Sequence, residues 1–416
     1  MQMKFGATSR ILFVLCLLYL ILYIDRVNIS TSAPLIKAEL GLNNAQLGLA
    51  FSAFAYPYAF FQLVGGWLGD RFGPRRVLFV SGIVVTLATV ATGFVGGLAS
   101  LIAARFVLGL GEGATFPTAT RAMATWVPEA RWGFAQGITH SAARIGNALT
   151  PPLVALLVGY ASWRGSFLFF AAFNLLWILP WLWVSKGETR RPPAAGGRRT
   201  TPWWALARRM LPVTSVDFCY GWTLWLFLSW IPSFFFDTFH LDLKGSALFS
   251  SGVFTAGVVG DLVGGIATDY LLKRTGRLAL ARQTVIVTGF LGAFLCLLPV
   301  VFVHDLTIDA IFLSLAFFSA ELIVAPIWSV PMDIAPGHAG SASGLMNLGF
   351  GIAGIVSPSC FGLLIDLTGS WTVPFGVSMG LLLLGAALAG RMRPDRPFID
   401  PTRPSAIADI PQRQQS

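Results

Sequence analysis

Long apolar runs separated by short polar turns recur along the whole chain. A helix needs about 20 apolar residues to cross a hydrocarbon core roughly 30 Å thick, and these runs have that length. An open strand in lipid would leave its backbone polar groups unpaired, so each run is predicted to be a helix. Hydropathy and turn signals predict twelve such runs. Their predicted bounds are 11–33, 47–69, 77–97, 100–126, 133–160, 163–184, 211–236, 246–271, 283–303, 307–332, 340–366 and 371–392.

Two polar segments interrupt this pattern. The segment 185–209 is rich in Arg, Pro, Gly and Ala, which is typical of a solvated linker. The segment from Pro394 onward repeats Pro, Arg and Gln, which is typical of disorder. We therefore predict an all-α integral membrane protein with twelve transmembrane helices in two pseudo-symmetric bundles. Its predicted parts are an N-terminal six-helix bundle over 1–184, a cytosolic linker over 185–209, a C-terminal six-helix bundle over 210–393 and a disordered cytosolic tail over 394–416.

The two predicted bundles resemble each other in sequence. The segment 65–70 (GGWLGD) closes the second run, and 264–269 (GGIATD) closes the eighth, 199 positions later. Pro151 in the fifth run is matched by Pro358 in the eleventh, at an offset of 207. A nearly constant offset indicates a duplicated six-helix unit. Repeats of this kind usually place a binding site at the interface between two halves that rock about it.

Composition narrows the class of protein. Apolar residues make up 55% of the chain and charged residues only 12%, against about 25% charged in a soluble domain. This excludes an ordinary cytosolic enzyme. The net charge of +10 suggests a nucleic-acid partner, but most of the 29 Lys and Arg lie in the tails and in alternate loops. That asymmetry is a topology signal, so we predict cytosolic termini and no nucleic-acid partner.

The loop after the second run carries the strongest local motif. Its residues are Gly66, Asp70, Arg71, Gly73, Arg75 and Arg76, and a weaker copy lies at Asp269, Lys273 and Arg274. Small residues let helices approach closely, and Asp70 can accept hydrogen bonds from a helix N-terminus in one conformation and lose them in another. The motif resembles the signature loop of the major facilitator superfamily, and the resemblance extends over about 10–392. An alternative is that the three arginines only set the topology.

The first run contains Tyr23-Ile24-Asp25-Arg26. Charged side chains at membrane depth are costly and are by default pathway or binding residues. Neighbouring positions on a helix point about 100° apart, so one of the two charges can face a cavity while the other faces a neighbouring helix. An alternative is that Asp25 and Arg26 neutralise each other or reach the outer surface.

The fourth run contains Arg105 and Glu112, which are two helical turns apart on one face. Arg26 and Arg105 are predicted at similar depth, and two guanidinium groups suit an anionic substrate because they form forked bonds to a carboxylate. Glu112 lies deeper, where desolvation disfavours the charged carboxylate and makes protonation accessible near neutral pH. An alternative is a purely structural Arg105–Glu112 pair.

Together with Phe51–Phe54 in the second run, these features resemble the anion:cation symporter family, which includes bacterial sugar-acid and organic-anion permeases. The resemblance implies proton-coupled symport of an organic anion. Arg26 and Arg105 match the family's substrate arginines. Asp25 and Glu112 match its protonation sites. The resemblance also implies hydroxyl, ring and amide contacts to the substrate from Tyr58, Trp328 and Asn347.

The chain departs from the family in the fifth run, where sugar-acid members commonly carry an amide side chain. Here the sequence is Ser141-Ala142-Ala143-Arg144, and Arg144 serves either a second carboxylate or a cytosolic-side salt bridge. His140, one turn earlier, either assists proton release or packs. Three further acids lie within predicted helices and receive no substrate role. They are Asp217, Asp261 and Glu321.

The sequence therefore predicts a secondary active transporter that carries an organic anion, a sugar acid or other carboxylate, with a proton by alternating access. It is expected to act as a monomer in a bacterial inner membrane, with the lipid bilayer around it and no cofactor or metal beyond the coupling proton. An enzyme is not expected, because no nucleophile–base or metal constellation lies at reactive spacing. The alternatives are a major facilitator exporter of a drug or other small molecule, a channel, or a membrane-embedded enzyme.

Overall fold

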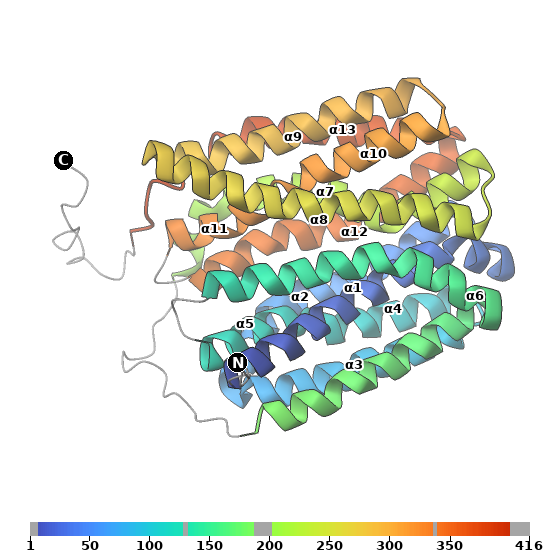
Figure 1. The fold of residues 1–416 in the computed structure, drawn as a ribbon, viewed down its shortest axis with the longest axis horizontal. Helices are drawn as coiled ribbons and strands as arrows, with labels where there is room; N and C mark the ends of the chain where they lie inside the picture. The colour runs from blue at the N-terminus through green and yellow to red at the C-terminus, as the bar shows by residue number, and fades with distance from the viewer. Residues whose placement is uncertain (1–6, 128–131, 187–201, 336–338, 400–416) are drawn as a thin grey trace, which may run out of the picture.

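The computed structural model describes residues 7–127, 132–186, 202–335 and 339–399, which form thirteen α-helices (Figure 1). The helices of the first part of the chain are α1 (Ala7–Leu40), α2 (Asn44–Phe72), α3 (Pro74–Gly93), α4 (Leu98–Gly113), α5 (Thr115–Trp126) and α6 (Trp132–Val184). Those of the second part are α7 (Trp203–Phe239), α8 (Leu243–Thr275), α9 (Leu278–Phe302), α10 (Leu306–Glu321), α11 (Val324–Ile334), α12 (Ala339–Thr368) and α13 (Thr372–Ala389).

These helices correspond to the twelve predicted runs, which confirms the fold class. The fourth run is α4 and α5, interrupted at Ala114, and the tenth is α10 and α11, interrupted at Leu322. The fifth and sixth runs share the label α6, but they are two helices separated by non-helical backbone at Ala161 and Ser162. Ser162 has a φ of 61°, so the chain turns there without a separate loop.

Nine helical stretches in the described part are long and apolar enough to cross a membrane. Large apolar side chains are exposed along their sides, among them Leu87, Leu179 and Ile266. In water such a surface would be unfavourable, whereas in lipid it faces a solvent of its own polarity.

We call the end of the molecule at which α1 begins the proximal end, on the left in Figure 1, and the opposite end the distal end. Local sequence sets several helix boundaries at the distal end. Asn43 and Gln46 form a capping box at the start of α2, and Asp242 accepts a hydrogen bond from the N–H of Gly245 at the start of α8. Gly41 and Gly369 follow α1 and α12 with φ values of 64°, a conformation that favours glycine.

Helices α1–α6 form one half of the molecule and α7–α13 the other, and the halves lie against each other along their length (Figure 1). Helix α2 packs on α12, and glycines make the approach possible. A Cβ atom on Gly48 would lie 2.4 Å from the carbonyl oxygen of Pro358. A Cβ atom on Gly362 would lie 2.2 Å from the carbonyl oxygen of Asn44. The backbones of the two halves therefore touch here.

The sequence repeat has a structural counterpart. A Cβ atom on Gly65 of α2 would lie 2.5 Å from the Cα atom of Ala114, where α4 gives way to α5. A Cβ atom on Gly264 of α8 would lie 2.4 Å from the carbonyl oxygen of Leu322, where α10 gives way to α11. In each half, a glycine of the repeated motif thus packs against the interrupted helix.

Two segments differ from the predicted layout. Helix α7 begins at Trp203, inside the predicted linker, and the chain is described up to Ile399, beyond the predicted start of the tail. Arg209 explains part of this order: its guanidinium donates hydrogen bonds of 2.7–3.0 Å to three carbonyl oxygens of 392–396. Composition alone does not reveal such a contact. The rest of the predicted linker and tail, 187–201 and 400–416, lies outside the described residues.

Candidate functional site

The centre of the first half holds a buried ion pair between α1 and α4. Nε of Arg26 donates to Oε2 of Glu112 at 2.7 Å, and the two side chains are 1% and 0% exposed. Five aromatic rings surround the guanidinium, with centroids 4.7–5.8 Å from its carbon. They belong to Tyr23, Phe54, Tyr58, Phe116 and Trp225. Cation–π attraction therefore adds to the ion pair in holding Arg26.

Arg105 lies beside this pair without a carboxylate of its own. It is buried, and its guanidinium carbon lies 4.9 Å from the centroid of Phe54, the ring that also faces Arg26. Within the described part of the chain, Arg105 forms no ion pair and its Nε has no hydrogen-bond partner. The buried pair is therefore Arg26–Glu112, and the alternative of a structural Arg105–Glu112 pair does not describe this conformation.

Asp25 points away from Arg26, as their separation of one helical position predicts. Its Oδ2 atom accepts hydrogen bonds from Nδ2 of Asn174 at 2.9 Å and from Oγ1 of Thr89 at 3.4 Å. Both partners belong to the first half, on α6 and α3. Among the described residues no ion pair joins Asp25 to Arg26, so the two do not neutralise each other by direct contact.

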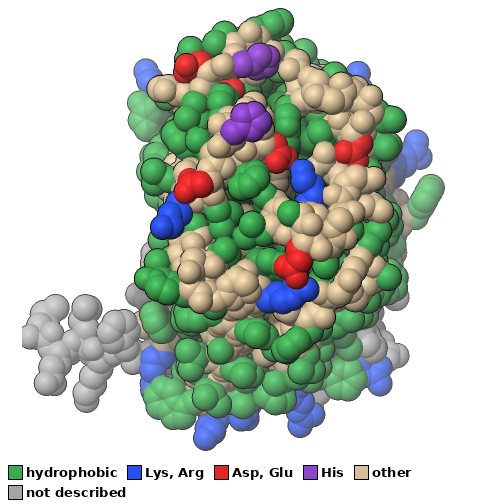
Figure 2. All heavy atoms as spheres, turned by 90° about the vertical axis from the view of Figure 1, so that its right-hand side faces the viewer, with side chains coloured by type: hydrophobic (Ala, Val, Ile, Leu, Met, Phe, Trp, Pro, Cys, Tyr) green, Lys and Arg blue, Asp and Glu red, His purple; other side chains and the backbone are tan. Residues whose placement is uncertain are grey.

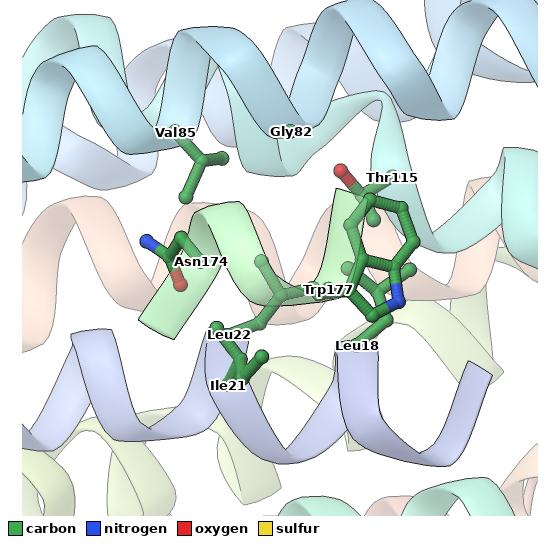
Figure 3. A pocket seen from close by; sticks show the side chains of 8 residues that line it. All are labelled: Leu18, Ile21, Leu22, Gly82, Val85, Thr115, Asn174 and Trp177. Atoms are coloured by element: carbon green, nitrogen blue, oxygen red, sulfur yellow. The ribbon is translucent and has the colours of Figure 1, made fainter. Parts of the chain in front are cut away.

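A small cavity adjoins the partner of Asp25 (Figure 3). It has a volume of about 10 Å³, which is close to that of one water-sized sphere. Asn174, Thr115, Val85 and Leu22 are among the residues that line it, and the surface that they present to it is apolar. A buried water needs polar partners, so this apolar space beside Asn174 is not a water site.

A second buried cluster joins the two halves, and we call it the inter-half cluster: Arg144, Tyr220 and Glu321. Nε of Arg144 on α6 lies 3.0 Å from Oε2 of Glu321 on α10, and the side chains are 4% and 0% exposed. Nη2 of Arg144 donates to the hydroxyl of Tyr220 on α7 at 3.4 Å, and this hydroxyl lies 3.4 Å from Oε1 of Glu321. Arg144 therefore binds a carboxylate of the other half.

The other residues that the sequence singled out are more scattered. His140 lies between two rings, with centroid distances of 5.5 Å to Tyr19 and 5.4 Å to Trp328, which fits its packing interpretation. Tyr58 stacks on Phe54 at 5.2 Å within the Arg26 cluster. Asn347 and Asp217 are buried and Asp261 is half-buried, and neither acid forms an ion pair within the described part of the structure.

The predicted loop motif lies at the proximal end between α2 and α3. Gly73 there has a φ of 81°, a left-handed conformation that requires glycine. Nη2 of Arg75 donates to the carbonyl oxygen of Leu182 at 3.5 Å, and Arg71 and Arg76 are exposed. Gly66 and Asp70 belong to α2, and the side chain of Asp70 lies outside the described part of the structure.

The weaker copy of this motif ends α8. Asp269 lies 4.0 Å from the guanidinium of Arg282, which also donates to Asp333 at 3.0 Å. Lys273 and Arg274 are exposed, and Arg274 donates to the hydroxyl of Tyr270 at 3.3 Å. The copied acid thus belongs to a proximal ion-pair network within the second half.

Several residues of the site were not predicted from the sequence. Asn174 carries a signal, because it is an isolated amide within an apolar run. Tyr220 and Trp225 carry none, because aromatic residues on membrane helices are more often packing or interface residues. The partnership of Arg144 with Glu321 is equally invisible, since it depends on how the two halves face each other.

Comparison with known proteins identifies the family of this chain. A profile of the Major Facilitator Superfamily matches residues 15–358. The chain is 48% identical over 403 residues to a probable sulfoacetate transporter of Cupriavidus necator, covering 93% of this chain and 94% of that one. It is 30% identical to a probable galactarate/D-glucarate transporter of Escherichia coli, covering 84% and 85%, and 28% identical to a hexuronate transporter of Bacillus subtilis, covering 88% and 89%.

Among solved structures, the fold resembles a bacterial homologue of the human lysosomal transporter Spinster in an inward-facing, unoccupied conformation. The TM-score is 0.74 at 18% identity, covering 93% of this chain and 98% of that one, so this likeness concerns the fold alone. The sequence relatives and the profile carry the assignment. The chain belongs to the major facilitator superfamily, a family of transporters and not of enzymes.

Proposed function

We propose that the protein carries a small organic anion across the membrane together with a proton, by alternating access of its two halves. The observation that supports this best is Arg105, a buried guanidinium with no ion pair among the described residues. A buried charge without a counter-ion is unfavourable, so the site favours an anionic ligand.

The charges around Arg105 indicate how many ligand charges the site accepts. Arg26 has Glu112 as its counter-ion, so that pair is neutral when the glutamate is ionised. Arg105 adds a positive charge that forms no ion pair with any described residue. Nη1 and Nη2 of Arg26 also have no hydrogen-bond partner in the described part of the structure. A carboxylate or sulfonate placed beside Arg105 can accept hydrogen bonds from both arginines.

Proton coupling follows from competition for Arg26. An ionised Glu112 holds the guanidinium, whereas a protonated Glu112 releases it to the substrate. Proton and anion therefore favour each other's binding, and such a coupling is reciprocal. Asp25, which accepts a hydrogen bond from Asn174, is the second proposed proton site. No cofactor beyond the proton is required, and the residues of one chain complete the site, as a functional monomer requires.

The relatives indicate the chemistry of the substrate. Their names refer to sulfoacetate, galactarate, glucarate and hexuronate, all of which carry a carboxylate. Sulfoacetate is the probe that the 48% identical relative suggests. Tyr58, which faces Arg26, is a proposed ring and hydroxyl contact, and Trp328 and Asn347 remain predicted contacts from the second half.

The location of charge supports the proposed orientation. Exposed cations gather at the proximal end, among them Arg76, Lys273 and Arg274. Because cytosolic loops carry an excess of Lys and Arg, we propose that the proximal end faces the cytosol. The bacterial relatives support placement in the inner membrane.

The test is uptake of radiolabelled sulfoacetate by proteoliposomes under a pH gradient. Glu112→Gln removes the proton that links substrate to gradient, so accumulation against a gradient is expected to fall at least tenfold while exchange of internal for external substrate persists. Undiminished uphill accumulation in this variant would show that Glu112 does not couple.

A second variant tests the anion site itself. Arg105→Gln is expected to weaken sulfoacetate binding at least tenfold, since truncating one member of a buried charged contact costs about 2–5 kcal/mol. Arg164→Gln is the matched control, because it removes a cation from the partly exposed distal pair with Glu39, 3.1 Å away. Unchanged affinity in Arg105→Gln would contradict the anion-site assignment.

A further inference from the structure

We propose that Arg144 and Tyr220 form a second anion subsite, and that the substrate is accordingly a short dianion held between Arg26 and Arg105 at one end and Arg144 at the other. This inference rests on the transport function proposed above, because it places the second anionic group of the same substrate. What it adds is that the inter-half cluster binds substrate and that the substrate carries two anionic groups.

Arg144 has the capacity to bind an additional group. A guanidinium has five N–H donors, and Arg144 directs Nε toward Glu321 and Nη2 toward Tyr220. Its Nη1 atom has no hydrogen-bond partner in the described part of the chain, although the side chain is only 4% exposed. A buried donor without a partner is costly, so the arrangement favours an acceptor at this atom.

Tyr23 connects the two subsites. Its ring centroid lies 4.8 Å from the guanidinium carbon of Arg26 and 5.6 Å from that of Arg144. The two guanidinium carbons therefore lie no farther apart than the sum of these distances. The subsites share one aromatic wall, and one small ligand can reach both.

The separation suits a ligand with two acidic groups on a short skeleton. A forked bond places a guanidinium carbon about 4 Å from the central atom of the acidic group. Two acidic groups on neighbouring carbon atoms, or joined by one, add roughly 3 Å between them. Such a dianion is long enough to place one acidic group at each guanidinium, even at the largest separation that the shared ring allows.

In both subsites a buried glutamate is the counter-ion of the arginine. Glu112 is the internal counter-ion of Arg26, and Glu321 is that of Arg144. The second pair crosses between the halves, so it must change when the halves move. Because an uncompensated buried charge costs several kcal/mol, a substrate group that replaces Glu321 keeps Arg144 neutralised during that movement.

The experiment compares the affinities of a dianion and a monoanion for the purified full-length protein. Calorimetry gives the dissociation constants of sulfoacetate and of acetate at one fixed pH. Arg144→Gln is expected to weaken sulfoacetate binding at least tenfold and to bring the ratio of the two constants toward one. Glu321→Gln removes the competing carboxylate and is expected to strengthen sulfoacetate binding several-fold. Changes of opposite sign cannot both arise from a damaged fold.

Lys37→Gln is the matched control, since it also removes an ion pair between the halves, with Asp237 at 3.2 Å, but at the distal end. It is expected to leave the ratio unchanged. If Arg144→Gln does not fold, Glu321→Gln still tests the subsite. An unchanged ratio in the variants of the inter-half cluster would overturn the second subsite while leaving the proposed transport function intact. Failure of the wild-type protein to bind either anion would instead overturn the proposed function.

Discussion

The distal and proximal ends of the molecule are held by different contacts. At the distal end the halves bind each other: Asp366 accepts hydrogen bonds from the backbone N–H groups of Asn44 and Ala45, at 3.2 and 2.6 Å. Figure 2 shows this face, where acidic and basic side chains lie close together. At the proximal end, the contacts described for Arg75 and Arg282 remain within one half.

This difference indicates which end of the interface between the halves must open for transport to proceed from this conformation. Alternating access, as proposed above, needs one end of the interface to separate while the other closes. In this structure the distal end is closed by backbone packing, hydrogen bonds and an ion pair between halves. The distal contacts must therefore break in each transport cycle, and their strength sets the balance between the two conformations.

The largest effect is expected from a covalent lock at the distal end. The hydroxyl oxygens of Ser52 and Ser359 lie 2.8 Å apart across the interface. A disulfide between Ser52→Cys and Ser359→Cys is expected to abolish sulfoacetate uptake, because the distal end can no longer open, and a reductant is expected to restore it. The four native cysteines, including the adjacent Cys360, are first replaced by serine.

The control for the lock is each single cysteine variant under the same oxidant, which should transport at an unchanged rate. Cross-linking is quantified by mass spectrometry. Full-rate uptake by the cross-linked protein would show that the distal interface does not separate during transport.

A smaller effect is expected from crowding the same interface. Gly48→Ala places a methyl group 2.4 Å from the carbonyl oxygen of Pro358, and a backbone atom cannot easily yield. Overpacking of this kind costs about 1–3 kcal/mol, which corresponds to a shift of roughly 5- to 160-fold toward the distally open conformation. The measurement is the rate at which an impermeant thiol reagent labels Ser359→Cys.

Gly380→Ala is the matched control, since a Cβ atom there would meet nothing within 4 Å. It should leave the labelling rate unchanged. Equal labelling of the Gly48→Ala and Gly380→Ala variants would contradict the view that close backbone packing closes the distal end.

The fold could be predicted from the sequence because its signal is local and repeated. Each helix needs an apolar run of known length, and lipid permits no other regular structure for an isolated segment. The interruptions at Ala114 and Leu322 could not be predicted in this way, since run length does not show whether a helix is continuous. They are seen in the structure, where Gly65 and Gly264 pack against them.

The sequence indicates which charged residues are candidates for the site, but not which residues they pair with. Buried charges are costly enough to mark Arg26, Arg105 and Glu112 as functional candidates from sequence. Depth along a helix, however, does not fix which neighbour a side chain faces, so the pairing of Glu112 with Arg26 needed the structure. The contact of Arg144 with Glu321 depends on the docking of two halves, which no local pattern encodes.

The smallest effect is expected from the distal ion pair. Lys37 and Asp237 are 26% and 27% exposed, and a partly exposed pair contributes about 0–1 kcal/mol. Lys37→Gln is therefore expected to change the initial rate of sulfoacetate uptake by no more than about fivefold, and added salt should reduce the difference because it screens the charges. Rates at low and high ionic strength measure this. If Lys37→Gln instead opened the distal end as far as Gly48→Ala, charge rather than backbone packing would be what closes that end.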